Sequence, residues 1–187
     1  MLDSLPDLTL RTATEADLDA VMALEFQGFD PAFHESRAVY QQRIQTFPQG
    51  AILAVRQGLP AGCFFSEIWR AGSVSEADSF AIGHDIRERH DTSGTALYVA
   101  SMTLSPTLRG GGIGLRFFQA CLDRLIAEHP ALASVVLLVN EHWAPARKIY
   151  GHAGFVEERR LAGFFQALSG PSGDGIIMSR PIPARKS

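Results

Sequence analysis

The feature that most constrains the fold is a β-α-β pattern in the middle of the chain. Residues 97–104 are predicted to form a strand, which Pro106 ends before a glycine cluster opens a helix. The helix carries apolar residues at the 3.6-residue spacing expected of a helix packed on a sheet. Residues 135–139, VVLLV, are apolar throughout, which is typical of a strand buried on both faces. We therefore expect two parallel strands joined by a helix at the centre of the fold.

The rest of the chain adds strands and helices around this pattern. Apolar spacing and turn residues predict strands at 8–11, 51–56, 61–69, 155–168 and 176–180, and helices at 14–25, 36–44 and 145–151. Residues 170–175 are predicted to be the loop before the last strand. Polar residues 70–96 are expected to be an insertion with a helix at 76–89. A length of 187 residues predicts one domain, 1–187.

Composition and charge narrow the class of protein. Apolar residues make up 46% and charged residues 20% of the chain, as in soluble globular domains. The net charge of −3 predicts no basic surface for nucleic acid. The N-terminal residues lack a basic segment followed by an apolar run, so neither export nor a membrane partner is expected. Cys63 and Cys121 lie in apolar segments, which favours free thiols over a disulfide and a cytoplasmic location. The acidic and histidine residues at 84–91 match no metal motif, so no metal is expected.

The segment Arg109-Gly-Gly-Gly-Ile-Gly114 lies between the predicted strand and the N-terminus of the long helix. Successive glycines let backbone N–H groups converge on one point, and the helix N-terminus adds unpaired donors with a partial positive charge. Such a turn can bind phosphate, and a flexible loop is the alternative. The spacing fits neither G-x-G-x-x-G nor a loop that ends in Gly-Lys-Ser/Thr. It does match R/Q-x-x-G-x-G/A, the pyrophosphate-binding motif of the GNAT superfamily, through Arg109, Gly112 and Gly114.

A second segment, Ala146-Arg-Lys-Ile-Tyr150-Gly-His-Ala-Gly154-Phe155, resembles the A-x-x-x-Y-x-x-x-G-F segment of the same superfamily. Two independently spaced motifs are more specific than either one. The chain is therefore similar to GNAT N-acetyltransferases, and residues 64–69 and 140–146 look most like the arylalkylamine enzymes and their bacterial relatives. The resemblance implies acetyl-CoA as co-substrate. It also implies an α/β (α+β) fold: a mixed, mostly antiparallel sheet with a central parallel strand pair and helices on both faces.

The resemblance further implies which residues bind the coenzyme. The strand before the glycine turn would offer a backbone N–H to the acetyl carbonyl, where a β-bulge would open the sheet. The residues expected on the coenzyme are Met102, Thr103, Leu104, Arg109, Gly110, Gly111, Gly112, Ile113, Gly114, Asn140 and Ala146. Trp143 stands where many relatives have asparagine, and Tyr98 and Ala100 stand where arylalkylamine enzymes have two histidines. The catalytic relay of those histidines is therefore not expected here.

Acetyl transfer to an amine needs an acid for the leaving thiolate and a base for the protonated amine. Tyr150 is the expected acid, because a tyrosine pKa of about 10 keeps the proton available, and a core aromatic is the alternative. Glu67 is the first candidate for the base, on the argument that apolar neighbours raise its pKa. A carboxylate at the rim or in an ion pair fits the pattern equally well. Tyr98 and Ser101 on the next strand could instead orient a water molecule.

The loop between the first two helices is rich in aromatic residues. These side chains could line an amine-binding slot, or they could anchor the loop to the core by hydrophobic contact. The expected substrate residues are Phe29, Phe33 and Tyr98, and the candidates to attract a cation are Glu25, Asp30 and Glu35. The favoured acceptor is a small (aryl)alkylamine. One alternative is a protein N-terminus, which needs an open groove around residues 28–33. Another is a sensor module that binds acyl-CoA without turnover. A homodimer is left open.

Overall fold

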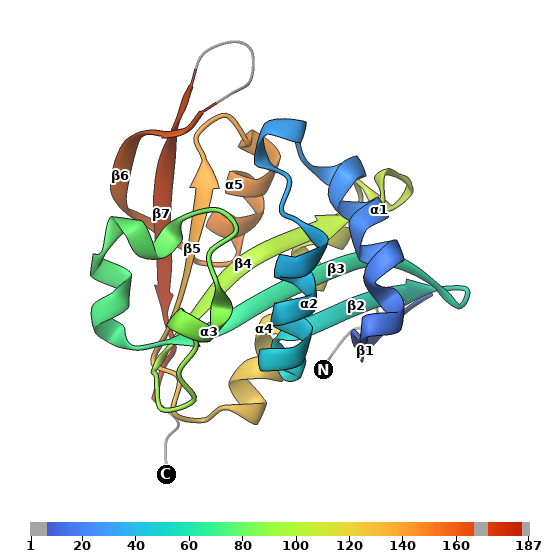
Figure 1. Cartoon of the computed structure of the whole chain (residues 1–187), viewed down its shortest axis with the longest axis horizontal. Helices are drawn as coiled ribbons and strands as arrows, with labels where there is room; N and C mark the ends of the chain where they lie inside the picture. The colour runs from blue at the N-terminus through green and yellow to red at the C-terminus, as the bar shows by residue number, and fades with distance from the viewer. Residues whose placement is uncertain (1–6, 167–171, 185–187) are drawn as a thin grey trace.

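The computed structural model describes residues 7–166 and 172–184, and within them seven strands form one sheet (Figure 1). In pairing order the strands are β1 (Leu8–Thr12), β2 (Ala51–Arg56), β3 (Leu59–Trp69), β4 (Ala96–Leu104), β5 (Ser134–Asn140), β7 (Gly173–Pro181) and β6 (Val156–Phe165). All neighbours are antiparallel except β4 and β5, which are parallel. The predicted mixed sheet with a central parallel pair is confirmed.

Helices cover both faces of this sheet. Helices α1 (Leu18–Gly28) and α2 (Arg37–Thr46) pack on one face against β2 and β3. Helices α4 (Ile113–Glu128) and α5 (Ala144–His152) pack on the other face, where Phe117 and Phe118 of α4 are fully buried. Figure 1 shows α1 and α2 in front of the sheet and α4 behind it. Helix α4 connects the two parallel strands, as the β-α-β pattern predicts.

The parallel pair separates part-way along its length. Strands β4 and β5 pair only from Ala96–Ser134 to Val99–Leu137. At this point β4 also carries a bulge, because Phe65 pairs with Ser101 and Ser66 with Val99, so Ala100 is an extra residue in the ladder. A bulge increases the local twist and bends the strand, and the ends of β4 and β5 consequently diverge (Figure 1). The expected bulge is present, and the sheet opens toward the glycine turn.

The segment between β3 and β4 differs from the prediction. A helix over 76–89 was expected, but the structure has two 3-10 turns, Ala71–Ser75 and Ala77–Phe80, and one short helix, α3 (Ile86–Arg89). Gly83 has a φ of 73°, a left-handed conformation that interrupts a right-handed helix. Asp85 then starts α3 by accepting a hydrogen bond from the N–H of Arg87. The helix prediction was wrong because these local signals divide the segment.

The last hairpin also departs from the predicted boundaries. Strand β6 ends at Phe165, three residues before the predicted end, and residues 167–171 lie outside the described part of the chain. Strand β7 begins at Gly173, so 173–175 belong to the strand rather than to the predicted loop. Among the described helices, none combines the length and apolarity that a membrane crossing requires.

Candidate active site

The glycine turn precedes α4 in a conformation that only glycine adopts readily. Gly110, Gly111 and Gly112 have φ values of 95°, 56° and 74°, all in the left-handed region. Gly112 is the N-cap, and α4 begins at Ile113. The turn therefore delivers the first N–H groups of a 16-residue helix to one open surface, with the positive end of the helix dipole behind them. This is the arrangement that binds phosphate groups at helix N-termini.

This turn forms one wall of a large cavity, which encloses about 1600 Å³ including its opening to solvent. Its walls come from the end of β4, the glycine turn with the start of α4, α5 with the turn before it, and the end of α1. The predicted coenzyme residues that line it are Met102, Thr103, Leu104, Arg109, Gly110, Gly112, Gly114 and Ala146. Gly111 and Ile113 belong to the same turn but are not on the cavity wall.

Asn140 lies apart from this cavity. It is buried at the end of β5, and its side-chain oxygen accepts a hydrogen bond of 2.9 Å from the N–H of His142. Its place on the wall is taken by His142 and Trp143, which follow it in the chain. The structure thus gives Asn140 a role in shaping the β5–α5 turn.

Tyr150 is buried on α5, with its ring against Phe118 at 5.1 Å and Phe155 at 6.1 Å between centroids. Burial raises the pKa of its hydroxyl to about 12. Ala146 and Ile149 of the same helix line the larger cavity, whereas Tyr150 lies behind them in the core. Its hydroxyl retains its proton at neutral pH, as an acid must before it acts.

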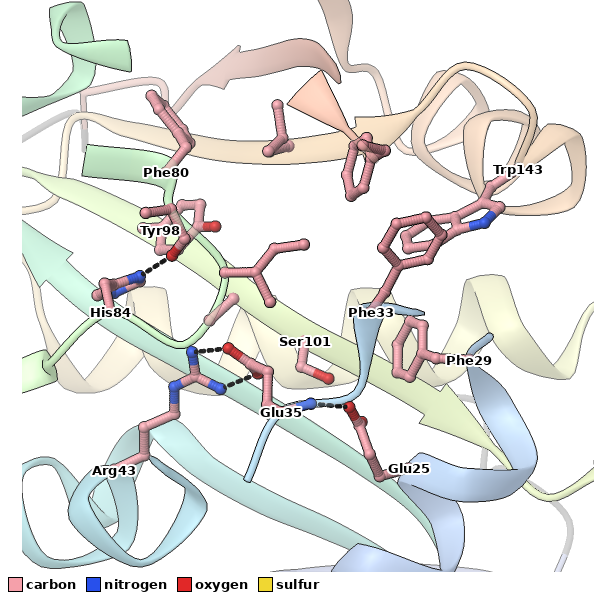
Figure 2. A pocket seen from close by; sticks show the side chains of 15 residues that line it. Glu25, Phe29, Phe33, Glu35, Arg43, Phe80, His84, Tyr98, Ser101 and Trp143 are labelled. Carbon is pink, nitrogen blue, oxygen red and sulfur yellow. Dashed lines mark hydrogen bonds and ion pairs between the residues drawn. The ribbon is translucent and has the colours of Figure 1, made fainter. Parts of the chain in front are cut away.

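The smaller cavity lies on the other side of Trp143 and encloses about 490 Å³ (Figure 2). It is lined by α1, the α1–α2 loop, α2, residues 80–84 and the central strands. The predicted substrate residues Phe29, Phe33 and Tyr98 all line it. Figure 2 shows Phe29, Phe33 and Trp143 gathered at one end and Phe80, Tyr98 and His84 at the other. The structure therefore brings the three predicted residues into one pocket.

The two cavities share a wall. Phe29 and Trp143 line both of them, with ring centroids 5.5 Å apart. Ala100 and Ser101 line the smaller cavity and the next residue of β4, Met102, lines the larger one. The cavities consequently meet where β4 bulges and separates from β5.

A buried ionic network forms the floor of the smaller cavity. Arg43, on α2, holds Glu35 in a bidentate pair, with a distance of 2.8 Å from Nη2 to Oε1, and its Nε lies 3.5 Å from Oε1 of Glu67. Burial lowers the pKa of Arg43, but the two carboxylates outweigh it and raise the pKa above the usual value. Glu35 also accepts a hydrogen bond of 2.9 Å from the N–H of Gly83. The network therefore ties α2, the α1–α2 loop and the β3–β4 segment together.

Glu67 is fully buried within this network, and the expectation of a raised pKa was wrong. Burial raises its pKa, but hydrogen bonds from His84 at 2.9 Å and Trp69 at 2.8 Å, with the charge of Arg43, outweigh burial and lower it. A carboxylate with a lowered pKa is a weak base. Glu67 also does not line either cavity. The structure places it as an ion-pair partner, the alternative that the sequence left open.

His84 is the cation that Glu67 holds. Nδ1 lies 2.9 Å from the carbonyl oxygen of Ala81 and Nε2 lies 2.9 Å from both oxygens of Glu67, so both ring nitrogens face acceptors. Burial lowers the pKa of His84, but Glu67 outweighs burial and raises it above the usual value. Two donors are present only in the protonated ring. His84 is therefore an imidazolium that closes one end of the pocket.

Glu25 is the acidic residue that sequence reasoning undervalued. It lies on α1, is 1% exposed and lines the smaller cavity. Oε2 accepts a hydrogen bond of 2.6 Å from the hydroxyl of Tyr40, and Oε1 accepts one of 2.8 Å from the N–H of Glu35. Burial raises the pKa of Glu25, and the hydrogen bonds offset this only in part. The sequence signal was an acidic residue on the otherwise apolar face of a helix.

Comparison with known proteins supports this description. No family model matches the chain. The uncharacterized N-acetyltransferase YkwB of Bacillus subtilis is 31% identical over 113 residues, which are 57% of this chain and 50% of that protein. The chain therefore spans about half the length of the curated relative it matches.

Solved structures match over nearly the whole chain. The GNAT-like decarboxylase GphF in complex with isobutyryl-CoA has a TM-score of 0.76 at 20% identity, covering 92% of this chain and 98% of its own. The loading GNATL domain of CurA from Lyngbya majuscula has a TM-score of 0.78 at 16% identity, covering 93% and 97%. The chain has the GNAT fold. The ribosomal-protein-S18-alanine N-acetyltransferase of Escherichia coli matches at a TM-score of 0.65 and 19% identity, with 94% of each chain covered.

At the wall that the two cavities share, this chain has Trp143 where the sequence resemblance predicts asparagine, as in many GNAT relatives. Trp143 contacts Phe29, Phe33 and Phe165, with ring centroids 5.5, 5.9 and 5.3 Å apart. A cluster of this kind covers the mouth of the smaller cavity with aromatic surface. The predicted resemblance to arylalkylamine enzymes remains a prediction.

Proposed function

We propose that the chain is an N-acetyltransferase that moves an acetyl group from acetyl-CoA to the nitrogen of a small primary amine by direct attack. The observation that carries the proposal is the junction of the two cavities at the bulge of β4. One cavity has a phosphate-binding turn, and the other has a buried carboxylate. Thioester and amine would meet at Phe29 and Trp143, which line both.

The coenzyme half rests on the glycine turn and the open end of β4. Arg109 and the N–H groups of the turn would bind the pyrophosphate. Beyond Val99, β4 has no partner in β5, so backbone groups on that side are available to the extended arm of the coenzyme. The relative YkwB is named an N-acetyltransferase, and the similar structure of GphF holds isobutyryl-CoA. Both support an acyl-CoA in this groove.

The amine half rests on charge. Around the smaller cavity, Glu25, Glu35 and Glu67 provide three carboxylates, while Arg43 and His84 provide two cations. Both cations are engaged by Glu35 and Glu67, which leaves Glu25 without a positive partner among them. A buried carboxylate is stabilised by a cation brought next to it. The protonated form of an amine is such a cation.

Closure of the pocket favours a small amine over a protein N-terminus. Phe33, in the α1–α2 loop, contacts Phe165 at the end of β6 with ring centroids 5.3 Å apart. On the other side, Glu35 of the same loop accepts a hydrogen bond from the N–H of Gly83. These contacts bridge the α1–α2 loop to its neighbours on both sides, where a peptide chain would need an open groove.

The chain's own residues would perform the transfer in three ways. Backbone N–H groups of β4 near Met102 would stabilise the oxyanion that develops on the thioester carbonyl. The aromatic wall of Phe29 and Trp143 would exclude water and hold the amine nitrogen near the carbonyl carbon. Tyr150 would give its proton to the thiolate as the carbon–sulfur bond breaks. Because its pKa of about 12 lies above the thiol pKa of about 8.5, this transfer would be coupled to a proton passing from the amine nitrogen to Tyr150.

Decarboxylation, the activity named for GphF, is less compatible with this pocket. An acyl group that carries a carboxylate would place a second negative charge beside Glu25 in a buried site. Like charges in such a site repel strongly. The charge of the pocket thus supports acetyl transfer to an amine.

The proposal is tested by following thiol release from acetyl-CoA with a panel of arylalkylamines, polyamines, amino sugars and short peptides. Coenzyme binding is measured in parallel by calorimetry. We expect turnover with a small amine and a loss in the Tyr150→Phe variant, which removes one oxygen from a buried ring. Binding without turnover across the panel would indicate a sensor module, and turnover only with peptides would contradict the small-amine assignment. Failure to bind acetyl-CoA would contradict the proposal as a whole.

A further inference from the structure

We infer that Glu25 is the general base of the proposed transfer, that Ser101 binds the incoming ammonium with it, and that Tyr40 is the residue that positions both. The inference deepens the proposed function and rests on it. Glu25 and Ser101 both line the smaller cavity (Figure 2). Tyr40 does not line it and is fully buried. Three elements supply the group: α1, β4 and α2.

The location of Ser101 ties this group to the reacting atoms. Ser101 follows the bulge residue Ala100 and lines the smaller cavity, and the next residue, Met102, lines the larger cavity. An amine that contacts the Ser101 hydroxyl therefore lies at the junction of the two cavities. Glu25 is joined to this point through Tyr40, whose hydroxyl oxygen lies 2.6 Å from Glu25 Oε2 and 3.3 Å from Ser101 Oγ.

The hydrogen-bond directions leave acceptors for the substrate. The hydroxyl of Tyr40 has one proton, and it donates this proton to Glu25. Tyr40 must then accept from Ser101, so the Ser101 hydroxyl proton points away from the cavity. The lone pairs of Ser101 and the remaining lone pairs of Glu25 are left to face the cavity. A protonated primary amine has three N–H donors and matches this set of acceptors.

The proton balance of the reaction assigns Glu25 its step. The ammonium loses one proton to the Glu25 carboxylate, which becomes a carboxylic acid, and the freed nitrogen lone pair forms the bond to the carbonyl carbon. When the carbon–sulfur bond breaks, the thiolate takes the proton of Tyr150, and the nitrogen's second proton restores that of Tyr150. Glu25 releases its proton to solvent after the products leave. The sum is ammonium plus thioester giving amide, thiol and one proton.

Burial supports this role, because it raises the pKa of Glu25 above the ordinary value for this carboxyl group. A base is more effective when its pKa lies closer to the working pH. The titratable groups that face Glu25 are His34 and Glu35 from the α1–α2 loop, Tyr40 from α2 and the buried thiol of Cys63 from β3. His34 is the only imidazole among them, and its Nε2 lies 2.9 Å from the carbonyl oxygen of Phe29.

The test is the pH profile of kcat/KM for the best amine of the panel in wild type, Glu25→Gln and Tyr40→Phe. Wild type takes the ammonium, so its profile should rise through the pKa of Glu25 and stay flat up to the amine pKa of about 10. Glu25→Gln can use only amine that is already neutral. Its kcat/KM should fall by about 10²–10⁴-fold at neutral pH and then rise tenfold per pH unit. Tyr40→Phe removes a donor to the carboxylate, so the acid limb should move to higher pH.

Two control variants make the outcome decisive. Glu128→Gln alters an exposed carboxylate paired with Arg124 and should leave the profile unchanged. His34→Gln should retain the acid limb, and its loss in that variant would assign the limb to His34 and overturn the inference. A Glu25→Gln enzyme that keeps the wild-type profile, or that changes KM alone, would also overturn it. If wild type transfers acetyl groups but His34→Gln loses the acid limb or Glu25→Gln keeps the wild-type profile, only the base assignment fails. Absence of coenzyme binding in wild type would instead reject the proposed function.

Discussion

Replacing Arg43 by methionine should destabilise the protein strongly. The side chain of Arg43 is 2% exposed, and it is paired with Glu35 at 9% and Glu67 at 0% exposure. Its removal leaves the buried Glu35 without its cation and leaves Glu67 with His84 alone. Breaking a buried ion pair by removing one partner costs about 3–5 kcal/mol. At about 2–4 °C per kcal/mol for a domain of this size, the melting temperature should fall by about 6–20 °C.

The assay is urea unfolding followed by circular dichroism, with the melting temperature as a second readout. Arg37→Met is the matched control, because Arg37 pairs with Asp19 at the surface with side-chain exposures of 52% and 90%. An exposed pair contributes about 0–1 kcal/mol. The double variant Arg43→Met with Glu35→Gln should lose about 1–3 kcal/mol less unfolding free energy than the two single variants lose in sum. A loss in Arg43→Met no larger than in Arg37→Met would refute the reasoning that burial makes this network costly to break.

Three further changes have definite expected results. Glu67 raises the pKa of His84 above its unfolded value of about 6.5, so the His84–Glu67 pair stabilises the folded protein. This contribution is fully present below about pH 6.5 and is lost as pH rises through the folded pKa of His84. The difference in unfolding free energy between wild type and His84→Gln, measured by urea titration, should therefore shrink at alkaline pH, and a difference that grows would contradict the assignment. Gly112→Ala should lose about 1–2 kcal/mol of stability for its φ of 74° and weaken acetyl-CoA binding in calorimetry, while unchanged binding would exclude the turn from the site. Trp143→Ala should open the wall between the cavities, so that bulkier amines gain kcat/KM relative to small ones, and an unchanged ranking would show that Trp143 does not limit acceptor size.

Local patterns were sufficient for the coenzyme cavity. The strand, the glycine turn and the helix follow one another directly, so residues 102–114 lie together in any fold that keeps the β-α-β unit. Seven of the predicted coenzyme residues line the cavity for this reason, and an eighth, Ala146, reaches it from α5. Asn140 did not follow the pattern, because the β5–α5 turn uses its side chain as a cap for His142.

The acceptor site was harder to predict because its chemistry depends on contacts distant in sequence. For Glu67 the sequence left a base amid apolar neighbours and an ion-pair or rim carboxylate equally open. Its partners Arg43 and His84 come from α2 and the β3–β4 segment and reverse the expected sign of its pKa shift. Glu25 acquires its burial and its hydrogen bonds from Tyr40 and the loop at Glu35, which no local period indicates. Charge partners of this kind are visible only after the chain folds.

The central claim, that an amine in the smaller cavity attacks a thioester in the larger one, is tested most directly by product stoichiometry. Wild type is mixed with acetyl-CoA carrying an isotope-labelled acetyl group and the best amine, and thiol and labelled N-acetyl product are quantified by mass spectrometry. The account predicts one N-acetylated amine for each thiol released, with both falling together in Glu25→Gln. Thiol release without labelled amide would mean that water rather than the amine reaches the thioester, and it would contradict the account.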